Sequence, residues 1–262
     1  MIRFLHLSDT HFLKNYNGEF NEFGVDYDPH EKLNYALSLI DYTTIDFVVI
    51  TGDLIHDGGE EDYEGLDLLL KTYIPQEIPM YYCLGNHDNK QAFHKAILKE
   101  DSSSLYYYEV FHNGYRLLIL DTSNQESHDG EIKQEQEEWI IEKLKVPSEK
   151  GTLIFQHHPL LIGWEPNVSE TRISNTYIEH LCQSDVRGIF TGHLHENRHV
   201  MVGNIPQHTA AALSFGLTQV GNRAWFTDKL GYSIVSVDDE TVDVFTETTN
   251  PLIKRYFPQI IE

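Results

Sequence analysis

The sequence predicts an α/β fold in which much of the sheet is parallel. Three observations predict it: short apolar runs recur along the chain, amphipathic helical segments separate several of them, and most of the runs end in small or polar residues. A run that is apolar at nearly every position is typical of a strand buried on both faces. Strands that alternate with helices favour parallel pairing through crossover connections.

Five such runs are the expected strands of this sheet. They cover residues 2–7, 47–50, 80–84, 153–155 and 186–190. Arg187 interrupts the last run, which makes it the least regular of the five. Two further pairs of β-rich segments predict antiparallel hairpins, because a short polar turn joins the members of each pair. These pairs are 106–108 with 115–120, and 232–237 with 242–246.

Apolar residues at helical spacing predict four helices between the strands. They cover residues 29–42, 61–73, 134–144 and 174–182. The first has Asp28 as its N-cap and Pro29 at its first position, and Pro75 marks the end of the second. The loop 12–28 is rich in aromatic residues and follows the first strand, a place where long loops are often functional.

Length and composition predict a single domain over residues 1–262. The chain is 40% hydrophobic, enough for a large core, and has no apolar run near the ~20 residues of a membrane span. Its net charge of -22 disfavours the binding of nucleic acid polymers and of anionic membranes. Cys83 and Cys182 are interpreted as reduced thiols, and the N-terminal residues lack the pattern of a signal peptide. We therefore expect a cytoplasmic protein.

Residue types that bind metals gather where the expected strands end. In open α/β sheets, ligands bind beyond the carboxyl ends of the strands, so these residues are candidates for one common site. Carboxylate, amide oxygen and imidazole together suit divalent Mn, Fe, Zn or Co, and strand-end loops leave coordination positions open for water and substrate. The residues fall in five motifs, in chain order: Asp9-x-His11, Gly52-Asp53, Gly85-Asn86-His87-Asp88, His157-x-Pro159 and Gly192-His193-x-His195.

This ordered set resembles the calcineurin-like metallophosphoesterase superfamily, and within it the bacterial class III cyclic nucleotide phosphodiesterases and the glycerophosphodiesterases. The similarity runs from about residue 2 to about residue 246. It implies a four-layer α/β/β/α double β-sandwich that holds two divalent metal ions at one edge. By this resemblance Asp53 bridges the two ions. The first ion would also be held by Asp9, His11 and His195, and the second by Asn86, His157 and His193.

The resemblance further implies hydrolysis of a small phosphodiester, of the cyclic nucleotide or glycerophosphodiester type, by in-line attack of a metal-bridging hydroxide. Asn86 and His87 would contact the substrate, and a protonated His87 would assist the leaving oxygen. A phosphomonoesterase acting on nucleotides or other small phosphates stays open, because the same attack serves both reactions. A non-catalytic scaffold is disfavoured because all seven ligand positions and His87 are kept, and a nuclease is disfavoured by the net charge of -22.

Two residues inside the motifs have more than one interpretation. His158 competes with His157 for the ligand role, and the spacing to Pro159 in the family pattern favours His157. Asp88 either caps a helix that begins near Asn89 or forms hydrogen bonds behind the site, and we expect the cap.

Outside the motifs, His6 is expected in the interior, because it alternates with core side chains. His56 and Asp57 are expected to have a loop role rather than to bind metal, and His128 to be exposed or structural. The segment 211–231 is apolar enough for dimer contacts or for closing the substrate pocket, so a homodimer is one expected assembly.

Overall fold

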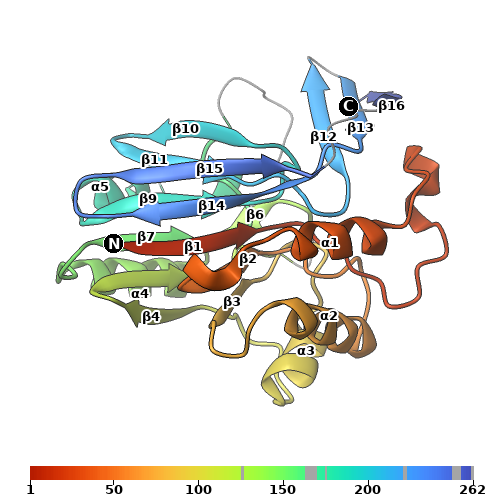
Figure 1. Ribbon diagram of the computed structural model, residues 1–262. Coiled ribbons are helices and arrows are strands. Elements are labelled where there is room, and N and C mark those ends of the chain that lie inside the picture. The colour runs from red at the N-terminus through yellow and green to blue at the C-terminus, as the bar shows by residue number, and fades with distance from the viewer. Residues whose placement is uncertain (125–126, 163–169, 175, 221–222, 250–254, 261–262) are drawn as a thin grey trace.

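Two mixed β-sheets pack face to face at the centre of the molecule (Figure 1). The structure is a computed structural model, and it describes residues 1–124, 127–162, 170–174, 176–220, 223–249 and 255–260. The first sheet has the strand order β15-β14-β1-β2-β3. Its strands are β1 (Ile2–Leu7), β2 (Phe47–Thr51), β3 (Met80–Cys83), β14 (Gly231–Val237) and β15 (Val242–Thr248).

The second sheet has the strand order β10-β11-β9-β7-β5-β4. Its strands are β4 (Tyr108–His112), β5 (Tyr115–Ile119), β7 (Thr152–Phe155), β9 (Val186–Thr191), β10 (Arg198–Val202) and β11 (Ile205–Thr209). Buried residues of both sheets form one apolar cluster between them. Within it the ring of Phe4 stacks on Phe47 at 4.9 Å and meets Phe190 edge-on at 5.1 Å.

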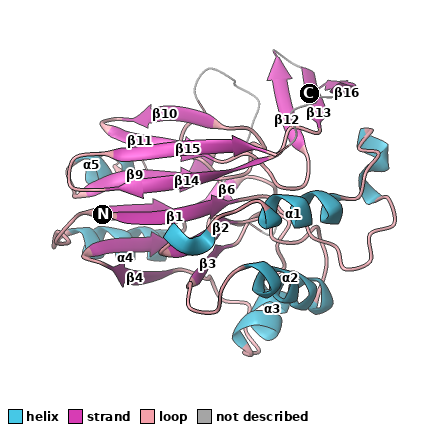
Figure 2. Ribbon diagram, viewed as in Figure 1, coloured by secondary structure: helices cyan, strands magenta, loops and turns pink. Residues whose placement is uncertain are grey.

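Helices cover the outer faces of both sheets (Figure 2). The helices α1 (Pro29–Ser38), α2 (Glu60–Tyr73) and α3 (Lys90–Phe93) share a core with the first sheet, whereas α4 (Gln134–Leu144) and α5 (Tyr177–Cys182) share one with the second. Along β1, Phe4 faces the other sheet while Leu5 and Leu7 face the helices, as the two-residue period of a strand requires. The fold is thus the four-layer α/β/β/α double sandwich that the resemblance implied.

The parallel pairs place the predicted motifs at one edge. Strands β1, β2 and β3 pair in parallel, and so do β5, β7 and β9. Strands that run in the same direction end at the same edge of their sheet. Each strand of the motif set leads directly into its polar loop there.

Most predicted elements are confirmed, and their ends account for the differences. The first helix ends at Ser38 rather than at residue 42, because Asp41 accepts hydrogen bonds from the N–H and hydroxyl of Thr43 and starts a separate 3₁₀ turn, Tyr42–Thr44. Its predicted cap is confirmed, since Asp28 Oδ1 accepts from the N–H of His30 at 2.8 Å. Both predicted hairpins form, the first from Tyr108 instead of residue 106.

Smaller elements lie around this framework. A two-stranded pair joins β6 (Gly130–Glu131) to β8 (Thr171–Arg172), and a three-stranded sheet contains β12 (Gly216–Val220), β13 (Arg223–Thr227) and β16 (Arg255–Ile260). In Figure 1 the three-stranded sheet stands apart from the two central sheets, beside the C-terminal end. A short 3₁₀ helix covers Glu19–Phe23, and a short π-helix covers His94–Leu98. Among the described residues, no helix has the length and apolar character needed to cross a bilayer.

Candidate metal centre

The loops that follow the strands stay paired beyond the ends of the sheets. The N–H of Asp9 donates to the carbonyl of Gly52 at 3.1 Å, and the N–H of His11 donates to that of Asp53 at 2.9 Å. In the second sheet, the N–H of Gly192 donates to the carbonyl of His157 at 2.9 Å. These backbone hydrogen bonds extend the strand pairing into the loops, so the side chains of the motifs are held in fixed register.

The first group of candidate ligands consists of Asp9, His11, Asp53 and His195, all of them buried. Each offers a donor atom, and these atoms lie within 4.8 Å of one another. His11 Nε2 lies 3.5 Å from Asp53 Oδ2 and 3.1 Å from His195 Nε2. His195 Nε2 lies 3.3 Å from Asp9 Oδ1.

The second group surrounds His157. His157 Nε2 lies 3.3 Å from Asp53 Oδ2 and 3.2 Å from Asn86 Oδ1. The ring of His193 lies 5.1 Å from the ring of His157. Asp53 Oδ2 therefore faces imidazoles of both groups, because it also lies 3.5 Å from His11.

His157 and His158 are distinguished by what their ring nitrogens contact. Both nitrogens of His158 have partners away from the centre, the hydroxyl of Thr122 at 2.9 Å and the carbonyl of His128 at 3.1 Å. His157 uses only Nδ1 in this way, donating to the carbonyl of Thr51 at 2.7 Å, and turns Nε2 toward Asp53. The geometry thus favours His157 as the ligand, with His158 packed beside His193 at a ring distance of 4.5 Å.

Strained backbone is concentrated at the candidate ligands. Positive φ angles occur at Asp9 (51°), His11 (40°), Asp53 (47°), His193 (72°) and His195 (52°). Residues other than glycine rarely adopt a positive φ angle. Such backbone strain persists mainly where the surrounding structure enforces it, often at functional sites. The segment of His193 and His195 is therefore not extended, because both residues have a positive φ angle. The two rings still face the centre, but His193 lies beside His157 and His195 contacts Asp9.

Two glycines of the motifs leave room for the carboxylates. A Cβ atom at Gly85 would lie 2.2 Å from Asp53 Oδ1, and one at Gly192 would lie 2.7 Å from Asp9 Oδ2. Neither separation is sterically allowed, so any side chain at these positions would displace a candidate ligand.

Charge interactions set the protonation of the centre in the metal-free protein. Burial opposes charge on His157, but the neighbouring Asp53 outweighs it and raises the pKa of His157 to about 9. Burial also opposes charge on Asp53, yet His157 keeps the pKa of that carboxyl well below its usual range. Burial, reinforced by His157, lowers the pKa of His193 to about 3. The centre thus combines ionised carboxylates with a neutral His193.

The donor set fits divalent cations. Two buried carboxylates and several imidazoles converge, and His11 Nε2 faces His195 Nε2 at 3.1 Å although only one of the two nitrogens can donate a hydrogen bond there. Burying so many polar atoms is unfavourable unless they are paired or coordinate a metal. Mixed oxygen and nitrogen donors suit Mn, Fe, Zn and Co alike.

His87 lies at the exposed side of the centre. Its ring is 4.9 Å from that of His11, and its backbone N–H donates to Asp53 Oδ1 at 2.9 Å. Its Nδ1 lies 3.0 Å from Asp57 Oδ1. This contact orients the ring through its Nδ1 atom.

The prediction that Asp88 caps the following helix is wrong. Asn89 is the N-cap, and its side chain accepts from the N–H of Ala92 at 3.0 Å. Asp88 is buried behind the centre and accepts from the N–H of Leu54, the N–H of Gly85 and the hydroxyl of Tyr63. Burial, followed by repulsion from Asp53, raises the pKa of Asp88 to about 7.

Sequence reasoning missed two residues at the centre. His56 Nδ1 lies 2.9 Å from His11 Nδ1. The exposed His128 has its Nδ1 2.9 Å from Asn86 Nδ2 and its ring 5.2 Å from that of His87. His56 follows Asp53 by three positions, which was a usable signal; nothing in the local sequence marked His128. The interior position expected for His6 is confirmed, with its Nε2 2.9 Å from the hydroxyl of Thr51.

The start of the segment 211–231 supports the centre from behind. The hydroxyl of Ser214 donates to the carbonyl of Asp9 at 2.7 Å, and His195 Nδ1 lies 2.7 Å from the carbonyl of Phe215. Residues Ala211, Ala212 and Leu213 are buried, and residues 221–222 lie outside the described part of the chain. A role of this segment in dimer contacts stays a prediction.

Comparison with known proteins gives one consistent result. The family model of the calcineurin-like phosphoesterases matches residues 2–197. A probable cyclic nucleotide phosphodiesterase from Rhodococcus erythropolis is 30% identical over 247 residues, which cover 91% of this chain and 80% of that protein. A cAMP/cGMP dual specificity phosphodiesterase from Mycobacterium tuberculosis is 30% identical over 221 residues, which cover 80% of this chain and 67% of that protein. A solved dimetal phosphatase from Danio rerio shares the fold, with a TM-score of 0.60 at 13% identity, covering 95% of this chain and 99% of that one.

Proposed function

Because this chain belongs to the calcineurin-like phosphoesterase family, we propose that it hydrolyses a small phosphodiester at a site that holds two divalent cations. The proposed substrates are of the cyclic nucleotide or glycerophosphodiester type. Two relatives whose names describe cyclic nucleotide phosphodiesterases support the first type, and each aligns with at least 80% of this chain.

The position of Asp53 is the observation that carries the proposal. A single oxygen of its carboxylate, Oδ2, lies 3.5 Å from His11 Nε2 and 3.3 Å from His157 Nε2. These two imidazoles belong to different donor groups, so Asp53 stands where the groups meet. We propose that Asp53 bridges the two cations. The remaining proposed ligands are Asp9, His11 and His195 for one cation, and Asn86, His157 and His193 for the other.

The chemistry follows from the groups around this centre. When bound, a pair of divalent cations supplies an activated water near neutral pH and positive charge for the oxygens of a phosphoryl group. His87 is the proposed catalytic residue of the chain itself, because its Nδ1 is held by Asp57 and its ring is partly exposed beside His11. From there a protonated His87 would hold a phosphate oxygen and donate a proton to the departing alkoxide. Asn86 adds an amide group on the same side.

The test is a substrate comparison with purified protein supplied with Mn²⁺. The substrates are bis-p-nitrophenyl phosphate, p-nitrophenyl phosphate, cyclic nucleotides and glycerophosphodiesters, each measured with and without a chelator. We expect metal-dependent turnover with higher kcat/KM for the diesters. A consistent preference for the monoester would instead identify a phosphomonoesterase, and turnover that persists after complete removal of metal would refute the two-cation site.

A further inference from the structure

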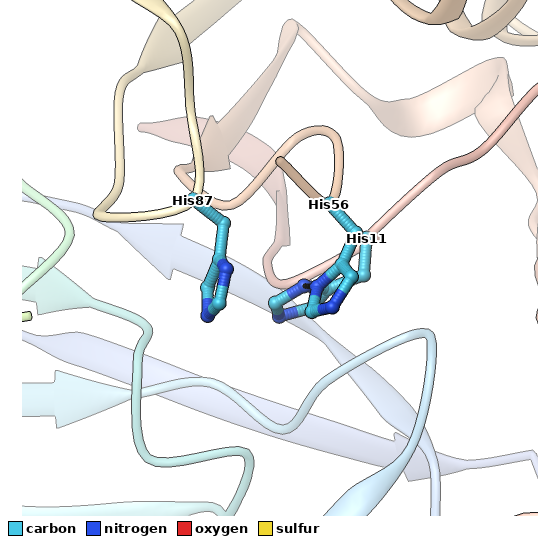
Figure 3. A group of neighbouring side chains, drawn as sticks. All are labelled: His11, His56 and His87. Carbon is cyan, nitrogen blue, oxygen red and sulfur yellow. Dashed lines mark hydrogen bonds between the residues drawn. The ribbon is translucent and has the colours of Figure 1, made fainter. Parts of the chain in front are cut away.

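His56 lies closer to a proposed metal ligand than a loop role requires. In Figure 3 the rings of His11, His56 and His87 lie together, with those of His11 and His56 almost in contact. His56 reaches this position from the loop after β2. That loop is fixed against the loop after β1, since Phe12 and Ile55 form a β-bridge and the N–H of Phe12 donates to the carbonyl of Leu54 at 3.0 Å.

The short contact joins the Nδ1 atoms of His11 and His56, which are 2.9 Å apart. This distance is typical of a hydrogen bond between nitrogens. The other nitrogen of His11, Nε2, faces Asp53 and His195. If Nε2 binds a cation it carries no proton, so the single proton of a neutral His11 is on Nδ1 and points at His56.

We propose that His56 is a positioning residue that accepts a hydrogen bond from Nδ1–H of His11 and so fixes the tautomer and ring orientation with which His11 binds its cation. The inference deepens the proposed function and rests on it, because it assumes a cation at His11 Nε2. Histidines that bind metals almost always donate their second N–H to a fixed acceptor, and losing that acceptor weakens metal binding.

Two neighbouring aromatic rings restrict the orientation of the His56 ring. The ring stacks on His87 with centroids 4.6 Å apart and planes inclined by 25°. Phe20 from the loop 12–28 meets it edge-on at 4.7 Å. The acceptor atom is therefore held in place by rings on two sides. The competing explanation is that His56 only fills the space between Phe20 and His87.

Two substitutions of His56 distinguish the contribution of its hydrogen-bond acceptor from that of its aromatic ring. His56→Phe keeps an aromatic ring between Phe20 and His87 but removes the acceptor. His56→Asn loses the ring and keeps an acceptor, because its Oδ1 takes the place of Nδ1.

Competition with a chromophoric chelator measures the affinity of each variant for Zn²⁺. We expect His56→Phe to bind zinc about 10–100-fold more weakly, and His56→Asn to keep most of the affinity. The exposed His180, changed to Phe, is the matched control and should bind as the unchanged protein does.

Two results of this comparison would overturn the proposal. Unchanged zinc affinity in His56→Phe would show that the acceptor is not needed. An equal loss in both variants would assign the effect to packing of the ring.

A measurement on the unaltered protein does not depend on how the variants fold. Nitrogen-15 NMR of the zinc-loaded chain should show a proton on His11 Nδ1 and a scalar coupling across the hydrogen bond to His56 Nδ1. Zinc uptake without this coupling would overturn the positioning role alone. A chain that takes up no zinc would refute the two-cation function, and with it the positioning role, even if the coupling were present; the two failures are therefore distinguishable.

Discussion

Asp53 takes part in both donor groups through one carboxylate oxygen. We predict that Asp53→Ala abolishes turnover and sharply reduces bound metal, since both proposed cations lose a ligand at once. Metal content by elemental analysis and turnover of bis-p-nitrophenyl phosphate are the measurements. The exposed Asp243, changed to Ala, removes the same charge far from the centre and should alter neither. Retained activity in Asp53→Ala would remove the bridging assignment.

As a proposed ligand, His157 should make metal binding depend on pH. Its pKa of about 9 means that it carries a proton near neutral pH in the metal-free protein. A cation binds only the unprotonated ring, so binding must release that proton. We therefore expect zinc affinity to rise with pH up to about 9, and about one proton or more to be released near neutrality. Calorimetry in buffers of different ionisation enthalpy counts the protons. An enthalpy that is the same in all buffers would contradict the assignment of His157.

The sequence allowed the candidate ligands to be predicted but not the residues around them. Asp9, Asp53 and His157 follow apolar strands directly, so their place at a sheet edge follows from pairing alone. Asp88 has a strong local tendency to cap a helix. The structure instead uses it for backbone N–H groups of Leu54 and Gly85 that are buried behind the centre. These N–H groups need a buried acceptor only because the two loops pack together in the folded chain. No local sequence pattern indicates this role of Asp88.

At the scale of elements, the short loops depend on glycine next to the carboxylates. A Cβ atom at Gly192 would lie 1.8 Å from Ser8 Oγ and 2.7 Å from Asp9 Oδ2. We predict that Gly192→Ala lowers the free energy of unfolding by about 1–3 kcal/mol, as overpacking of a filled interior does, and weakens zinc binding by displacing Asp9. Denaturant unfolding and the zinc competition assay check the two effects.

Gly59 is the control position for the Gly192→Ala experiment, because a side chain there would have room. A Cβ atom there would meet nothing within 4 Å, so Gly59→Ala should leave zinc affinity unchanged. If Gly192→Ala behaved in the same way, the close approach of this loop to Asp9 would not constrain the centre.

The prediction of strands and helices succeeded where the apolar pattern was continuous. The helix predicted at 134–144 matches α4, whose residues Trp139, Ile140 and Leu144 pack in the core that it shares with the second sheet. The first helix was predicted too long, because the apolar spacing continues past Ser38 while Asp41 starts a new turn. Periodicity reports which side chains are buried, whereas the end of a helix is decided by a few hydrogen bonds of single residues.

At the scale of the whole molecule, alternation of strands and helices predicted an α/β protein but not its two sheets. Strands β1 and β7 have similar apolar composition and belong to different sheets. The two strands differ only in the strands with which they pair. Such pairings join segments far apart in the sequence, so the local pattern of apolar residues does not reveal them. The four-layer arrangement was therefore foreseeable from the resemblance alone, and the structure explains it by the aromatic cluster in which Phe4 meets Phe155 edge-on at 5.4 Å.

The proposed ligands of the metal centre come from both sheets. Asp9 and Asp53 come from the first sheet, and His157 and His195 from loops of the second, so cations bound here would join the sheets. A ligand that binds only the folded state stabilises it by about 2.7 kcal/mol at a free concentration of 100 times its Kd. In a chain of this size that raises Tm by roughly 5–10 °C for each cation.

We predict such a rise in Tm, measured by calorimetry, when chelator-treated protein receives Mn²⁺. The rise should disappear in Asp53→Ala and persist in Asp243→Ala; an equal Tm with and without metal in the unaltered chain would mean that no cation links the sheets.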